Sequence, residues 1–143
     1  MTTRREQILS AITTALAGTT GVGSRIYRSR VEAFSRGESP AISLEPINDT
    51  PATNTSLPTL DWSLTVRIAV IVRGAIPDQL ADPIVESLHS LVMADLTLGI
   101  AGVMDIIPSS VDFQLIEADQ PAGVVLCDYV IRYRTSLADL TLS

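Results

Sequence analysis

The chain has 143 residues, which is long enough for one domain with a sizeable core and too short for two such domains. Its net charge of −6 and pI near 4.6 argue against general nucleic-acid binding, which requires a basic domain. Hydrophobic residues make up 46% of the chain and mean hydropathy is +0.32. This apolar excess predicts surface that a permanent subunit interface buries.

The first predicted element is an amphipathic helix over residues 4–17. Its apolar side chains recur at helical spacing, at Ile8, Leu9, Ile12 and Leu16. Thr3 and Glu6 form a capping box before them, and we expect the helix to close at Gly18 in the left-handed conformation. The charge of Glu6 and the polar residues of this segment favour a helix over a secretory signal peptide.

Two strands are predicted next, over residues 25–31 and 39–47, and Pro40 and Pro46 favour an edge position for the second. The glycine-rich turn at 18–24 follows a helix and lacks the Lys-Ser/Thr ending of a P-loop, so we expect no phosphate site. Residues 49–60 contain two prolines and four threonines without strong periodicity. We expect a long mobile loop there, because loops of this length are usually functional or disordered.

The clearest strand covers residues 62–74, where apolar and other side chains alternate. A second helix follows, starting at Asp82 and Pro83 or earlier near Asp78, and ending before Gly99. Two final strands are predicted over 111–118 and 124–135. The order α-β-β-β-α-β-β predicts an α+β fold, with a mostly antiparallel sheet of four to five strands and two helices on one face. We expect one domain over residues 1–143.

Catalytic chemistry has little support in the sequence. Cys127 is the one cysteine, which excludes an internal disulfide, and its apolar surroundings are typical of a buried small side chain. A catalytic pair with the one histidine, His89, is an alternative without a local sequence signature. The carboxylates show no metal-ligand spacing. We therefore expect no catalytic residue, no metal site, no cofactor and no enzyme activity.

All ten basic residues are arginine, and four of them lie between residues 25 and 36. Strand alternation also places Arg67, Arg73, Arg132 and Arg134 opposite the apolar faces of their strands. One interpretation is an ordinary solvated face paired with Asp128 and other carboxylates of the chain. The other is a surface for an acidic partner, such as a neighbouring copy, because exposed ion pairs stabilise a monomer by only about 0–1 kcal/mol.

A family resemblance follows from three segments taken in order. They read GVGSRIYRSRVEAFSRGESPAISL, LTLGIAGVMDI and EADQPAGVVLCDYVIRYRT. Together they resemble the tail terminator proteins of long-tailed bacteriophages and related prophages. The resemblance runs from about residue 4 to residue 136, and it depends on the order and spacing of short structural motifs.

The resemblance implies a structural protein that forms a hexameric ring, caps the head-proximal end of the tail tube, stops its polymerisation and offers a surface for head joining. The implied partners are other copies of the chain, the tail tube protein and a head-tail connector or neck protein. DNA would pass through the ring without specific binding, and no membrane is involved. The implied location is the neck end of the virion tail, reached from the host cytoplasm during assembly.

Residues predicted to contact another subunit or the tail tube fall into three groups. These are the basic stretch Arg25, Arg28, Arg30 and Arg36; the strand arginines Arg67, Arg73, Arg132 and Arg134; and the loop residues Asp49, Thr50 and Asn54. Trp62 is expected to pack in the core. Two alternative functions stay open: another neck or tail-completion protein of the same fold, and a monomeric ligand-binding α+β module.

Overall fold

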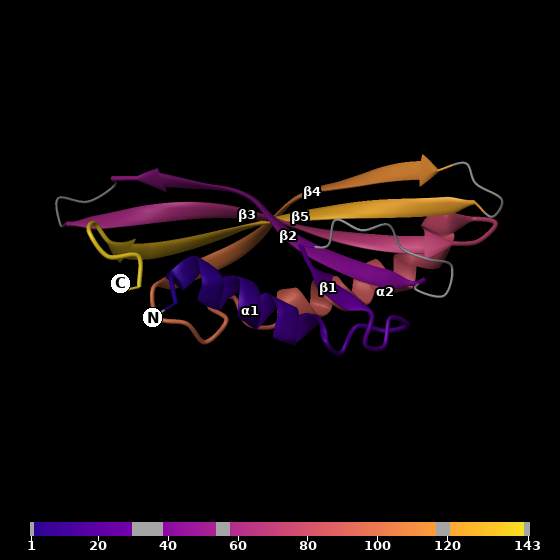
Figure 1. Ribbon diagram of the computed structural model, residues 1–143, viewed down its shortest axis with the longest axis horizontal. Helices are drawn as coiled ribbons and strands as arrows, with labels where there is room; N and C mark the ends of the chain where they lie inside the picture. The colour runs from indigo at the N-terminus through magenta and orange to yellow at the C-terminus, as the bar shows by residue number, and fades with distance from the viewer. Residues whose placement is uncertain (1, 30–38, 54–57, 117–120, 142–143) are drawn as a thin grey trace.

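A computed structural model describes residues 2–29, 39–53, 58–116 and 121–141. It has two layers, a long twisted sheet and a pair of helices that cover one face of it (Figure 1). The elements are α1 (Arg4–Leu16), β1 (Ile26–Arg28), β2 (Ala41–Ala52), β3 (Thr59–Arg73), α2 (Pro77–Val92), β4 (Val103–Ile116) and β5 (Ala122–Ser136). The strand order is β1-β2-β3-β5-β4. The predicted α+β class and element order are confirmed.

Only the pairing of β1 with β2 is parallel among the described strands, and the other neighbours are antiparallel. The long strands β3 and β5 form the centre, and their alternation sets the core. Leu64, Val66, Ile68, Val70 and Val72 of β3 are buried on the face toward the helices. The matching residues of β5 are Val125, Cys127, Tyr129, Ile131 and Tyr133.

Helix α1 begins as the sequence predicts, because the Thr3 hydroxyl accepts a hydrogen bond from the backbone N–H of Glu6 at 3.1 Å. Its four apolar side chains are buried on one side. The prediction that Gly18 adopts the left-handed conformation is wrong, because its φ angle is not positive. The positive φ angles lie further along the turn, at Gly21 (85°) and Gly23 (56°), where the chain reverses toward β1.

The expected loop over residues 49–60 is wrong at both ends. β2 continues to Ala52 and β3 starts at Thr59, so Asp49 lies opposite Leu64 and Thr50 opposite Ser63. Residues 54–57 lie outside the described residues. Proline is tolerated in this half of β2 because, in the described chain, ladder bonds form there only with β3. The predicted edge position therefore applies to the second half of β2.

Helix α2 starts at Pro77, near the earlier of the two predicted starts, and runs through Pro83. Its buried residues Ala81, Ile84, Leu88 and Val92 form the stripe that packs on the sheet. β4 is longer than the strand predicted over 111–118. Residues 103–110 were not predicted as part of this strand, because Pro108 is typical of a break in a strand. The register shifts between Pro108 and Ser110, as at a bulge.

Candidate interaction surface

The sheet face away from the helices carries three arginines that form ion pairs within the chain. Each arginine lies directly opposite its carboxylate on the neighbouring strand, in the pairs Arg67–Asp128, Arg132–Asp105 and Arg134–Asp61. The Arg132 guanidinium holds the pKa of the Asp105 carboxyl below its ordinary value, mainly through their hydrogen bonds. Cross-strand pairs of this kind help to fix strand register. Pairing with the chain's own carboxylates, one of the two interpretations of these arginines, is observed within the chain. An interface role for Arg67, Arg132 and Arg134 stays a prediction.

The basic stretch before β2 is also engaged within the chain. Arg28 donates from both terminal nitrogens to the Glu6 carboxylate, with the Nη2–Oε1 distance at 2.7 Å. Arg25 donates from Nε to the Pro40 carbonyl oxygen at 2.7 Å. These contacts tie the end of β1 to α1 and the residue before β1 to the residue before β2. An interface role for Arg25 and Arg28 stays a prediction, as it does for Arg73 at the end of β3.

Arg30, Arg36 and Asn54 lie outside the described residues, so their predicted contacts are untested. Thr50 is exposed on β2.

Asp49 joins three elements. Its carboxylate, 8% exposed, accepts a hydrogen bond from Arg5 Nε of α1 at 3.0 Å and another from the Tyr133 hydroxyl of β5. Burial raises the pKa of Tyr133, so this hydroxyl stays a donor. The Tyr133 ring stacks on Trp62 with centroids 6.2 Å apart. Trp62 itself is partly buried against the core. Through its two hydrogen bonds, Asp49 connects β2 to α1 and β5, so it has a structural role in the single chain.

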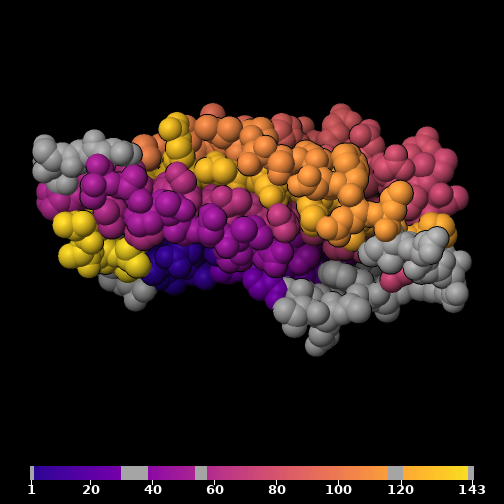
Figure 2. All heavy atoms as spheres, turned by 90° about the horizontal axis from the view of Figure 1, so that it is seen from above, coloured from indigo at the N-terminus to yellow at the C-terminus, as the bar shows by residue number. Residues whose placement is uncertain are grey.

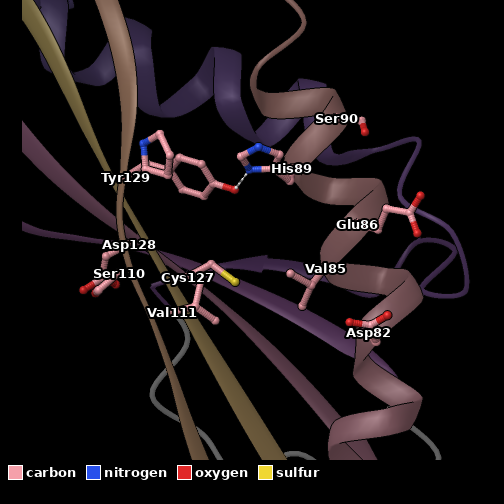
Figure 3. A pocket seen from close by; sticks show the side chains of 11 residues that line it. Asp82, Val85, Glu86, His89, Ser90, Ser110, Val111, Cys127, Asp128 and Tyr129 are labelled. Carbon is pink, nitrogen blue, oxygen red and sulfur yellow. Dashed lines mark hydrogen bonds between the residues drawn. The ribbon is translucent and has the colours of Figure 1, made fainter.

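A groove of about 310 Å³ runs between α2 and the sheet, bordered by β4 and β5 (Figure 3). Its inner wall is apolar, with Val85 of α2 facing Val111 and Cys127. His89 Nδ1 and the Tyr129 hydroxyl oxygen lie 2.8 Å apart at one end. Burial raises the pKa of Tyr129 to about 12. The groove can bury apolar side chains, and polar side chains from α2, β4 and β5, among them Asp82 and Glu86, also border it.

The groove does not have the electrostatics of a cysteine nucleophile. Burial raises the pKa of the Cys127 thiol to about 11, whereas a nucleophilic cysteine needs a lowered pKa. The His89 Nδ1 that could serve as a base is hydrogen-bonded to Tyr129 instead. Among the described residues, no group of three or more His, Cys, Asp or Glu side chains could hold a metal ion. No helix in the described ranges is long and apolar enough to cross a membrane.

The outer strand β4 carries exposed apolar side chains that the sequence analysis missed. Val111, Phe113 and Leu115 lie on the helix face of the sheet, beside α2, and Ile107 lies on the opposite face. Met104, near the start of β4, is also exposed. Phe113 is 64% exposed and Leu115 is 73% exposed, the two highest values among the large hydrophobic residues described. Within the described chain β4 pairs only with β5, so its other edge is open. This combination is typical of an interaction surface.

Comparison with known proteins adds a likeness in fold. No protein-family model and no curated protein matches the chain. Among solved structures, the chain is similar to one in the "Virion of native gene transfer agent (GTA) particle", with a TM-score of 0.67 at 13% sequence identity. The match covers 87% of this chain and 93% of that chain. The two chains therefore share a fold over nearly their whole lengths, and an identity this low shows nothing beyond the fold.

Proposed function

We propose that this protein is a structural component of a phage-like particle, and specifically a tail terminator. In this role it forms a hexameric ring on the head-proximal end of the tail tube, stops tube polymerisation and provides the surface to which the head connector or neck protein binds. DNA passes through the ring without specific contacts. The protein acts at the neck end of the virion tail after assembly in the host cytoplasm, and it is not an enzyme.

The observation that carries this proposal is the nearly full-length likeness in fold to a chain of a gene transfer agent virion. The resemblance of the ordered sequence segments to tail terminators points to the same class independently. The exposed apolar residues of β4 add a physical reason for assembly, since a permanent subunit interface buries such surface. The acidic balance of the chain is compatible with a ring that lets DNA pass.

Two other functions are compatible with the fold. Another neck or tail-completion protein would share the assembly role but bind to a tail that has already stopped growing. A monomeric ligand-binding module is the second candidate, and the apolar groove beside His89 and Tyr129 is the observation that favours it. A bound small molecule in the native mass spectrum of a monomer would identify that second function.

Tube termination is tested by adding the purified protein to polymerising tail tube protein from the same phage or prophage. We expect tubes that stop growing and carry a cap at one end, seen by negative-stain electron microscopy, because a bound ring removes the surface to which the next tube subunit adds. Bovine serum albumin at the same concentration is the control. Tubes of unchanged length without caps would contradict the terminator role.

A further inference from the structure

Charge is divided unevenly along the chain. Residues 74–131 contain nine aspartates and glutamates and no arginine or lysine. Eight of the ten arginines precede this stretch and the other two follow it. The fold turns part of this division into a spatial one, because α2 and β4 lie along one long edge of the molecule and α1 and β2 along the opposite one (Figure 2). The four arginines of β3 and β5 lie between the two edges.

The edge formed by α2 and β4, here called the acidic edge, combines carboxylates with apolar surface. Asp78, Asp82 and Glu86 are exposed at four-residue intervals along α2. Within the described part of the chain, none of the three forms an ion pair. Asp82 and Glu86 also border the groove of Figure 3. Four-residue spacing of like charges costs a few tenths of a kcal/mol per pair, about 0.2–0.5, unless a cation lies nearby.

The two edges of the sheet differ in how they are protected. At the β1 side the outer strand has three residues, and the exposed half of β2 contains Pro46 and Pro51. β4 has 14 residues, contains no basic residue and exposes apolar side chains. Proteins block open edges with short strands, prolines or lysines, because a long apolar edge invites pairing with another chain. In β4, Pro108 and two register shifts protect the first half, whereas residues 111–115 have neither a proline nor a register shift.

The opposite edge, here called the basic edge, offers arginine donors. Arg25 precedes β1 and Arg28 ends it, and the Arg28 side chain is 34% exposed. A guanidinium has five N–H donors, and the pairing of Arg28 with Glu6 uses two of its nitrogens. Donors remain for a carboxylate from another molecule.

We propose that the acidic edge of one copy binds the basic edge of the next copy, head to tail. Asp82 and Glu86 then face Arg25 and Arg28 of the neighbour, and Phe113 and Leu115 are buried between copies. Such a contact joins two different patches, so it generates a closed ring when the rotation between copies allows closure. The inference rests on the proposed function and names the surface through which the ring forms.

The test uses Glu86→Arg, Arg28→Glu and the double variant in the full-length chain, with native mass measured by light scattering over a range of concentrations. Each single reversal places like charges across the contact. We expect the concentration at which the ring dissociates to rise at least about tenfold, which corresponds to about 1.4 kcal/mol. In the double variant the two charges have exchanged sides of the contact, which restores the attraction between copies, so we expect the ring to return.

Asp95→Arg makes the same charge change as Glu86→Arg in the exposed turn after α2, and we expect it to assemble like the unmodified chain. Circular dichroism establishes that each variant is folded. The inference would be overturned if the single reversals assembled normally, or if the double variant dissociated at the same concentration as the single variants. The proposal that the protein forms a ring would then still hold. An unmodified chain that stays monomeric with and without tube protein would instead overturn the proposed function, and the inference with it.

Discussion

Replacing Ile68 with alanine will lower the free energy of unfolding by about 2–5 kcal/mol, the range found for large-to-small changes in packed cores. Ile68 is fully buried at the middle of β3, opposite Leu44 of β2 and Cys127 of β5. The substitution leaves a cavity in the layer between sheet and helices that its rigid neighbours cannot fill. Urea unfolding followed by circular dichroism measures the change.

Ile71 of the same strand provides the matched control. Its side chain is half-buried on the face away from the helices. Ile71→Ala removes the same atoms but less buried area, so we expect a loss of about 1 kcal/mol. If both variants lost the same free energy of unfolding in dilute solution, the face of the sheet toward the helices would not be the more buried face.

Gly123→Ala will destabilise the protein by about 1–3 kcal/mol, because it overpacks the contact between β5 and the start of α2. A Cβ atom at Gly123 would lie 2.5 Å from Cβ of Pro77, well inside contact distance. The proline ring is rigid and lies in the first turn of α2, so relief requires the helix to shift from the sheet. Thermal unfolding measures the effect as a lowered Tm.

Gly18→Ala is the control for this effect. A Cβ atom there would lie 3.7 Å from Cδ1 of Leu91, which is ordinary contact, and Gly18 has no positive φ. We expect its Tm to stay close to that of the unmodified chain. A Gly123→Ala variant as stable as Gly18→Ala would show that α2 is not packed closely on β5 at this point.

Local patterns were enough to predict the fold class and the order of helices and strands. The alternation in β3 and β5 and the apolar stripe of α2 each extend over many residues, so they indicate element type and buried face directly. The predicted ends of β2 and β3 were wrong because pairing between strands outweighed the local tendency of the residues to form a loop. Prolines and threonines at 49–60 are typical of a loop, yet pairing with β3 keeps β2 extended through Pro51.

The candidate interaction surface was harder to predict. Strand alternation correctly placed Arg67, Arg132 and Arg134 on one face, but alternation contains no information about which carboxylate lies across the strand. That depends on register, which is a tertiary property. The open edge of β4 depends on the order of strands in the sheet, which the sequence pattern did not predict either. Its one signal in the sequence is the run of residues 74–131 without a basic side chain, which a charge count by segment reveals.

The native mass of the purified, unmodified protein tests the central claim most directly. Light scattering over a range of protein and salt concentrations should find a hexamer, six times the 15.3 kDa of the chain, or a monomer that becomes one when tube protein is added. Assembly through charged edges should also weaken as salt rises. A monomer at every concentration, unchanged by the tube protein, would contradict the account.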